Sequence, residues 1–178
     1  MPDPLPCRSV AEAHLYLDLL GAPREDRDHR LEAWGDDLVS VYTVSMDDER
    51  YEVGFLSPED PLGVIGFGGD EPSEIIDPGQ WILHAGRLAA SVPADPAQVE
   101  PARRPAVAQR LEEAARCLDE AAKFIPPGED KMPPGAFWTP VGNLAYTREP
   151  GRFRRSRLEA VAATYREIAG RFTGAGSA

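Results

Sequence analysis

The sequence predicts an α+β fold, with a small antiparallel sheet packed on four or five helices. Two stretches rich in β-branched and aromatic residues, at positions 38–46 and 51–56, flank a polar turn of hairpin length. Four other segments carry apolar residues at three- and four-residue spacing, the period of a helix that buries one face. Helices and strands occupy separate blocks of the chain, an order typical of α+β proteins.

The N-terminal part predicts one helix ahead of the sheet. Residues 1–8 carry no periodic pattern, and we expect an irregular arm there. Ser9 and Glu12 form a capping-box pattern at the start of a helix over residues 10–20, and Gly21 is a natural C-terminal stop. The next segment, Ala22–Arg30, is charged and lacks periodicity, so it is expected to be a solvated loop.

Three short segments are expected to form the sheet. Leu38–Met46 and Tyr51–Leu56 are the two strands of the predicted hairpin. After a loop, Gly63–Phe67 is expected to add a third short strand.

The remainder of the chain predicts three further helices, over residues 78–91, from about 105 to 124, and about 152–172. The proline- and glycine-rich residues between the last two are expected to form a long packed connection whose aromatic side chains cover the core. We expect a single domain over residues 1–178. It would have an acidic half (1–100), a helical half (101–173) and a frayed tail (174–178).

Charge is distributed unevenly along the chain. Residues 1–100 contain 6 basic and 21 acidic residues, a net charge of −15, whereas residues 101–178 contain 13 and 9, a net charge of +4. An acidic half disfavours nucleic acid and anionic membranes as partners. It favours a basic protein partner, mainly through faster association. A solvated surface that keeps the protein soluble is the alternative explanation.

Several classes of protein are disfavoured by what the sequence lacks. No apolar run approaches the roughly 20 residues needed to span a bilayer, and no secretory signal pattern is present. Cys7 and Cys117 are too few for a disulfide framework, so we expect a cytoplasmic location. The three histidines have no metal-ligand spacing, and nucleophile and phosphate-loop motifs are missing. We therefore expect no metal, no cofactor and no enzymatic activity.

Residues 64–81, VIGFGGDEPSEIIDPGQW, contain the densest set of backbone signals. Gly68 and Gly69 predict a turn that leads into an acidic loop. Asp77 is expected to cap the following helix, with Pro78 at its first position. The acidic residues of the loop are expected to be solvated, with an acid/base pair as the alternative. They are Asp70, Glu71 and Glu74.

Four arginines cluster at the start of the last helix, where the helix dipole disfavours cations. We expect an acidic neighbour to relieve this repulsion, and the loop at residues 70–74 is one candidate. Arg154 and Arg155 are assigned a structural role on this basis.

Three blocks carry a resemblance: AEAHLYLDL (Ala11–Leu19), FGGDEPSEIIDPGQW (Phe67–Trp81) and GRFRRSRLEAVAATYRE (Gly151–Glu167). Together they resemble an uncharacterised family of small actinobacterial proteins of similar length, over most of the chain. The resemblance implies an immunity role, since such proteins resemble those encoded beside secreted polymorphic toxins. Relatives carry paired cysteines like a small zinc ribbon. This chain lacks them, which implies that any such metal site has been lost.

We therefore expect an immunity-type binding protein that occludes the basic active-site cleft of a toxin enzyme, of the nuclease or deaminase class. The expected partner contacts are acidic residues, with either Tyr51 or Trp138 as an aromatic anchor. They are Asp47, Asp48, Glu49, Tyr51, Asp70, Glu71, Glu74 and Trp138. One alternative is a small enzyme or ligand-binding protein with a pocket under the Gly66–Asp77 loop. Another is a structural protein that self-associates through its last helix.

Overall fold

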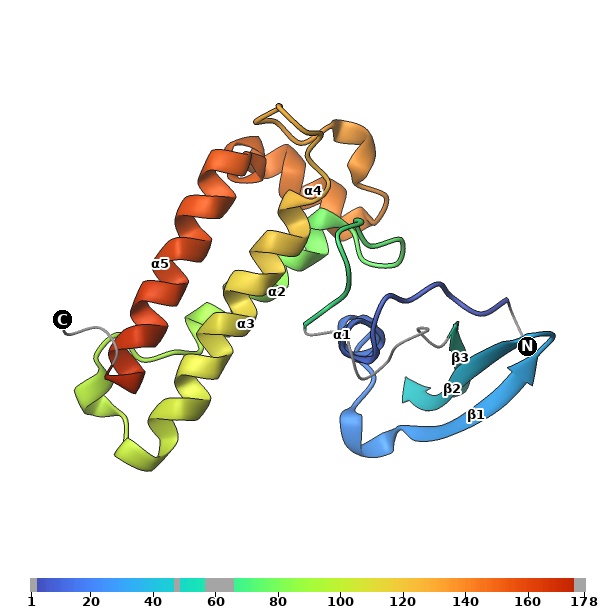
Figure 1. The fold of residues 1–178 in the computed structure, drawn as a ribbon. Coiled ribbons are helices and arrows are strands. Elements are labelled where there is room, and N and C mark those ends of the chain that lie inside the picture. Colours follow the sequence, from blue (N-terminus) through green and yellow to red (C-terminus); the bar gives the residue numbers. More distant parts are fainter. Residues whose placement is uncertain (1–2, 47–48, 57–65, 175–178) are drawn as a thin grey trace. The chain divides into compact units, whose positions relative to one another are not determined.

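The computed structural model describes residues 3–46, 49–56 and 66–174 of the chain (Figure 1). In these residues, a three-stranded antiparallel sheet and five α-helices confirm the predicted α+β fold class. The chain divides into two compact units, residues 1–76 and 77–178, and each is described by itself below. The prediction of a single domain over the whole chain stays a prediction.

The helix of the first unit, α1 (Val10–Leu19), begins where the capping pattern predicts. The backbone N–H of Glu12 donates a hydrogen bond to Ser9 Oγ at 3.1 Å, which satisfies one of the donors left open at a helix start. Gly21 follows the helix with φ +82°, a conformation that glycine adopts without steric cost. Both ends of this helix therefore follow from local sequence.

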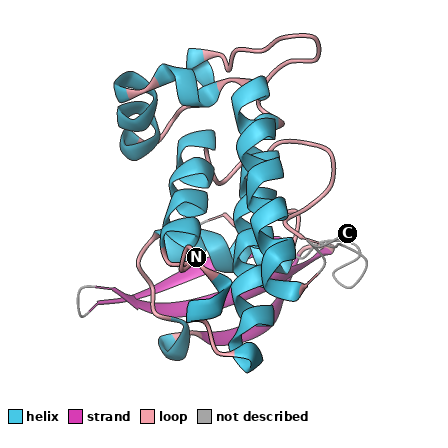
Figure 2. Ribbon diagram, turned by 90° about the vertical axis from the view of Figure 1, so that its left-hand side faces the viewer, coloured by secondary structure: helices cyan, strands magenta, loops and turns pink. Residues whose placement is uncertain are grey.

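The sheet contains β1 (Asp28–Trp34), β2 (Asp37–Met46) and β3 (Glu49–Leu56), in the order β1-β2-β3. Figure 2 draws its strands in magenta. β2 and β3 pair antiparallel and confirm the predicted hairpin. β1 pairs antiparallel with β2 through a two-residue turn, which places Trp34 opposite Asp37.

Two predictions for this unit need correction. The expected loop at Ala22–Arg30 is wrong at its C-terminal end, because residues 28–30 begin β1. β1 lacks an alternating pattern because it lies at the edge of the sheet and most of its side chains are exposed. The strand expected at Gly63–Phe67 falls largely outside the described residues, and Gly66 and Phe67 form a bend.

The arm before α1 is more regular than expected, because Leu5 pairs with β3. Its backbone N–H donates to Gly54 O at 2.8 Å, and Leu56 N–H donates to Leu5 O at 2.9 Å. On the face of the sheet that packs against α1, the ring of Tyr16 lies 5.8 Å from that of Phe55, nearly perpendicular to it.

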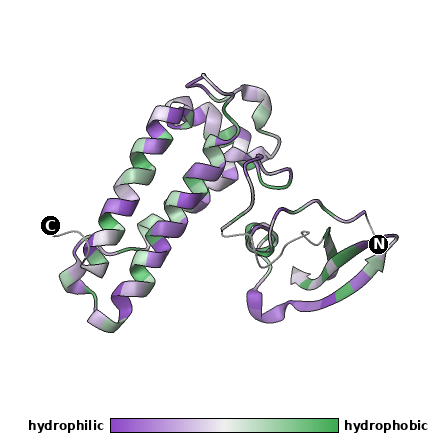
Figure 3. Cartoon of the chain, in the orientation of Figure 1, coloured by the Kyte–Doolittle hydropathy of each residue, from purple (hydrophilic) through white to green (hydrophobic). Residues whose placement is uncertain are grey.

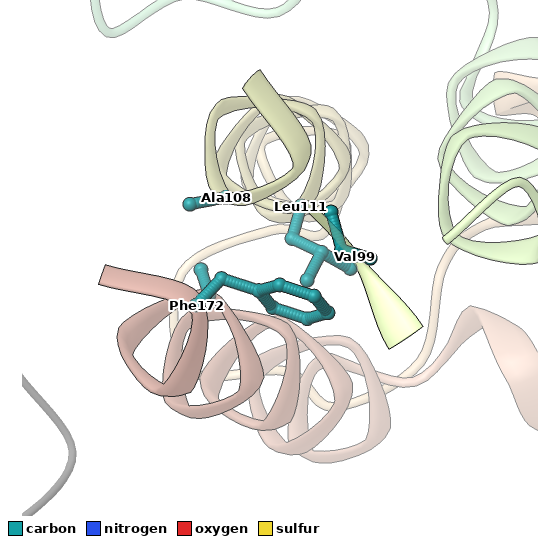
Figure 4. Packing of buried hydrophobic residues seen from close by; sticks show 5 residues of the cluster. Val99, Ala108, Leu111 and Phe172 are labelled. Atoms are coloured by element: carbon teal, nitrogen blue, oxygen red, sulfur yellow. The ribbon is translucent and has the colours of Figure 1, made fainter. Parts of the chain in front are cut away.

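The second unit contains four α-helices among its described residues: α2 (Pro78–Ala90), α3 (Arg104–Ala122), α4 (Pro140–Arg148) and α5 (Arg155–Thr173). α2, α3 and α5 confirm the three predicted helices, and α3 contacts both α2 and α5. Small side chains on α3 let these helices approach closely. Figure 4 shows one cluster of buried residues in this unit. Its members are Val99, Ala108, Leu111, Ala169 and Phe172.

The long connection expected over residues 126–151 contains α4, a helix that apolar periodicity does not predict. Thr139 caps α4, and its Oγ1 accepts a hydrogen bond from Gly142 N–H at 3.0 Å. The expectation that aromatic side chains of this segment cover the core is confirmed for Phe137, which is buried with its ring 4.9 Å from that of the buried Phe153. Trp138 differs, because it is 47% exposed.

Candidate functional site

An ion pair in the first unit joins the start of α1 to the acidic loop. Glu12 is fully buried, and its carboxylate accepts hydrogen bonds from Arg8 N at 2.7 Å, Nε at 3.0 Å and Nη2 at 2.6 Å. A buried carboxylate requires such a partner, because desolvation of an unpaired charge is costly. Arg8 Nη1 also donates to the backbone carbonyl oxygen of Glu71. One guanidinium group therefore binds both the helix and the loop.

The glycine turn is shaped around the same arginine. Gly68 has φ +148°, and a Cβ added there would overlap the side chain of Arg8. Gly69 differs, because a Cβ at this position would lie in open space. The close approach of the loop to Arg8 thus depends on glycine at position 68.

The C-terminal end of the loop is fixed by a buried serine. Ser73 Oγ accepts hydrogen bonds from the backbone N–H groups of Ile75 at 3.2 Å and Ile76 at 3.0 Å. The side chains of both isoleucines are buried. Polar and apolar contacts therefore hold this end of the loop, as Arg8 holds the other.

Three exposed carboxylates belong to this anchored loop: Asp70, Glu71 and Glu74. No ion pair joins any of them to another residue in the described part of the chain. They form the exposed acidic feature expected from the sequence. Negative potential on an ordered backbone attracts basic groups.

The other expected contact residues are distributed over both units. Asp47 and Asp48 lie outside the described residues. Glu49 and Tyr51 are exposed at the start of β3, where the tyrosine hydroxyl donates to Glu49 Oε2 at 2.6 Å. Trp138 belongs to the second unit and is 47% exposed.

Asp77 is a fully buried carboxylate shared by the starts of two helices. Its Oδ1 accepts from Gln80 N–H, and Gln80 Oε1 accepts from Asp77 N–H, both at 3.0 Å. Asp77 is therefore the predicted cap of α2, its bonds with Gln80 form a capping box, and Pro78 lies in the first turn as expected. The second carboxylate oxygen of Asp77, Oδ2, accepts hydrogen bonds from Thr139 N at 2.9 Å and Thr139 Oγ1 at 2.6 Å. The capping residue of α2 therefore also binds the capping residue of α4.

Two glycines allow these helix starts to approach. A Cβ added at Gly142 would overlap the carboxylate of Asp77, and one added at Gly79 would overlap the backbone of Gly142. The start of α4 was not predicted from the sequence. Thr139-Pro140 is nevertheless the same kind of helix-start signal as Asp77-Pro78.

The arginines at the start of α5 interact with the loop that precedes α4. Arg154 pairs with Asp130 at 3.4 Å, and Arg155 donates to backbone carbonyl groups near that residue. Asp130 Oδ1 accepts a hydrogen bond from Ser156 N–H at 2.8 Å, and this bond lowers the pKa of the Asp130 carboxyl. Asp130 is thus an acidic neighbour of these arginines, and its carboxylate also accepts from the first turn of α5. A contact of the arginines with residues 70–74 stays a prediction.

A cavity of about 250 Å³ in the first unit gathers side chains that sequence spacing does not connect. Its lining residues are His14, Arg24, Arg27, His29 and Tyr42. Asp18 accepts hydrogen bonds from both arginines, at 2.6 Å and 2.5 Å. Burial raises the pKa of the Asp18 carboxyl, but these two hydrogen bonds lower it below its usual value. Burial, followed by the charge of Arg27, lowers the pKa of His14.

Neither cysteine has the surroundings of a nucleophile. Cys7 Sγ donates to Leu56 O at 3.2 Å, and burial, with the charge of Glu12, raises the pKa of this thiol to about 11. Burial also raises the pKa of Cys117 well above its usual value. A low thiolate fraction disfavours nucleophilic chemistry at both positions.

Within the described ranges, no three His, Cys, Asp or Glu side chains are grouped so that they could hold a metal ion. No helix in the same ranges combines the length and the apolar character needed to cross a membrane. Comparison with known protein families, curated proteins and solved structures gives no match. The functional inference therefore depends on the chemistry of the chain itself.

Proposed function

We propose that this chain is a protein-binding module that neutralises a basic partner enzyme, in the manner of an immunity protein. The observation that supports this most directly is the loop of Asp70, Glu71 and Glu74. Its backbone is fixed at both ends, whereas its three carboxylates are exposed and have no ion-pair partner among the described residues.

Such a loop is suited to binding because its conformation is already set. A preordered loop loses little conformational entropy when a partner binds. Carboxylates needed only for solubility would not require a buried Arg8–Glu12 pair to hold their backbone in place. The net charge of −15 over residues 1–100 would accelerate encounter with a basic surface.

The partner class follows from the same chemistry. Enzymes that act on nucleic acids need a basic cleft for phosphate groups, and carboxylates can occupy that cleft in their place. A toxin domain of the nuclease or deaminase class fits this description and agrees with the resemblance in sequence. On this proposal the chain has no catalytic residue of its own.

The test is coexpression with the product of the neighbouring reading frame, followed by affinity measurements between about 50 and 300 mM salt. Replacing Asp70, Glu71 and Glu74 by lysine should weaken binding at least about a hundredfold and flatten its salt dependence. The matched control makes the same charge change at three exposed glutamates of the second unit. These are Glu100, Glu129 and Glu159. Equal losses for both triple variants would rule out this loop as the interface.

The cavity beside Tyr42 favours a second candidate function, the binding of a small anion. His14, His29 and two arginines line it. In titrations with inorganic phosphate, saturable NMR shifts of the ring signals of His14 and His29 would support this function. Shifts that increase linearly with concentration would oppose it. The pocket expected under the Gly66–Asp77 loop stays a prediction.

A further inference from the structure

One edge of the sheet is open. β1 pairs with β2 along one side, and its other side forms no bridge with any residue in the described part of the chain (Figure 1). The outer edge of β3, in contrast, is paired with Leu5. An unpaired strand edge presents a row of N–H and C=O groups that can accept another strand.

The hydrogen bonds between Leu5 and β3 show which residues of β1 direct their backbone groups toward the open edge. Leu5 N–H donates to Gly54 O, so Gly54 directs its backbone groups away from β2. Its partner Val41 then directs its groups toward β1, where it pairs with Arg30. Because direction alternates along a strand, Arg30 is bonded to β2 and Leu31 faces outward.

The turn between β1 and β2 gives the same result independently. A two-residue turn closes with a hydrogen-bonded pair, which here is Trp34 and Asp37. Counting back from Trp34 in steps of two gives residues 32, 30 and 28, which bond to β2. The residues between them, His29, Leu31 and Ala33, therefore lie at the open edge.

We infer that β1 pairs antiparallel with β1 of a second copy, in a register centred on Leu31, and that the two sheets form one six-stranded sheet. This register pairs all seven residues of each strand. Leu31 lies opposite Leu31, and His29 lies opposite Ala33 on either side of it. These are the outward-facing residues, so each of the three pairs exchanges two backbone hydrogen bonds.

The charges of β1 specify this register. Arg30 pairs with Glu32 and Glu52 of its own chain. In this register it also lies opposite the second copy's Glu32, and the symmetric pair repeats the contact. Moving the centre by one residue places Arg30 opposite Arg30 or Glu32 opposite Glu32, and like charges in these positions are destabilising. Figure 3 shows β1 as mostly hydrophilic with a hydrophobic interruption. Leu31, which is 56% exposed, would gain an apolar neighbour in the pair.

Sedimentation velocity on the full chain, from about 5 to 500 μM, tests this inference, since a short strand pair buries little area and forms a weak dimer. We expect a concentration-dependent dimer. Arg30→Glu alone and Glu32→Arg alone should each weaken association about tenfold or more. The double exchange should restore most of it, because only the contact of residue 30 with Glu52 of its own chain stays unfavourable. A monomer at every concentration, or single variants that associate as tightly as the unaltered chain, would overturn the inference.

Hydrogen exchange locates the interface. The backbone N–H groups of Leu31 and Ala33 face outward, so their exchange should slow as the protein concentration rises. Leu31→Lys should abolish this effect. The matched control is Leu144→Lys, a change at a leucine of the second unit that is 49% exposed, which should leave association intact. Loss of the dimer in the Leu144→Lys variant would place the interface elsewhere. So would a dimer in which the exchange rates of the Leu31 and Ala33 amides do not change with concentration.

Discussion

Replacement of Asp77 by alanine is expected to destabilise the second unit more than any other single capping change. Asp77 is fully buried, and its two carboxylate oxygens serve α2 and α4 together. Alanine removes the acceptor for three hydrogen bonds at once. Two of the donors are backbone N–H groups, of Gln80 and Thr139, which have no means of reorienting.

The magnitude follows from these two donors. Each of these two donors left without an acceptor costs about 1–3 kcal/mol, and for Gln80 this cost is the loss of the helix cap itself. Because water can partly replace the carboxylate, we expect a total loss of about 3–5 kcal/mol in the free energy of unfolding. That is a large part of the roughly 5–15 kcal/mol by which proteins are stable.

A second Asp-Pro pair in the chain supplies the control. Asp95 precedes Pro96 and caps a short 3₁₀ helix by accepting from Ala97 N–H at 2.8 Å, but its side chain is exposed. Asp95→Ala should therefore cost about 1 kcal/mol or less. Urea unfolding followed by circular dichroism measures both variants. If the loss at position 77 is no larger than the loss at position 95, the shared cap does not stabilise the fold as described.

A double-mutant cycle examines the same contact from the other side. Alanine in place of Gly142 would favour a helix by about 1 kcal/mol, but its Cβ overlaps the Asp77 carboxylate and should cost about 1–3 kcal/mol. In the double variant the Cβ enters space that the carboxylate has left. The combined loss should thus be at least about 1 kcal/mol smaller than the sum of the single losses. Additive losses would show that the two groups do not meet.

Three further outcomes are expected. Arg8→Ala leaves Glu12 buried without its cation and should lower the free energy of unfolding in urea by about 3 kcal/mol, whereas a loss under 1 kcal/mol would mean that the pair is dispensable. At pH 8 the native Cys7 thiol should react with iodoacetamide about a hundredfold more slowly than an ordinary thiol, and equal rates in native and urea-unfolded protein would contradict its raised pKa. The lowered pKa of His14 means that stability should begin to fall as pH drops below its usual value of 6.5. The lowered pKa of Asp18 adds a further loss only below about pH 3.8, so a flat profile from pH 8 to 3 would contradict both shifts.

Features encoded by a few neighbouring residues could be predicted from the sequence. The starts of α1 and α2 follow from Ser9 and Asp77, because a cap acts on amides two or three residues away. β1 could not be predicted this way. Hydrophobic alternation identifies a strand only when one face is buried, and six of the seven residues of β1 are exposed. α4 is short, and only Gly142 among its residues is buried, so it has no apolar stripe.

The candidate site was predictable only in part, for a related reason. Exposure of the acidic loop follows from its composition. Its anchoring does not, because the contact from Arg8 to Glu71 spans 63 positions of the chain. The cavity beside Tyr42 likewise joins His14 of α1 to His29 of β1, and no local pattern relates these two residues.

The structure also separates the carboxylates that stabilise the fold from the exposed ones at residues 70–74, which the proposed function assigns to a partner. Glu12, Asp77 and Asp130 each accept hydrogen bonds from nearby donors, so they contribute to the net charge without being free to bind. At physiological ionic strength a charge acts over about 8 Å, and distant carboxylates add little to the attraction at an interface. Binding should therefore depend on where a carboxylate lies rather than on the total charge. The two triple lysine variants change the charge equally, so any difference between them measures the contribution of position alone.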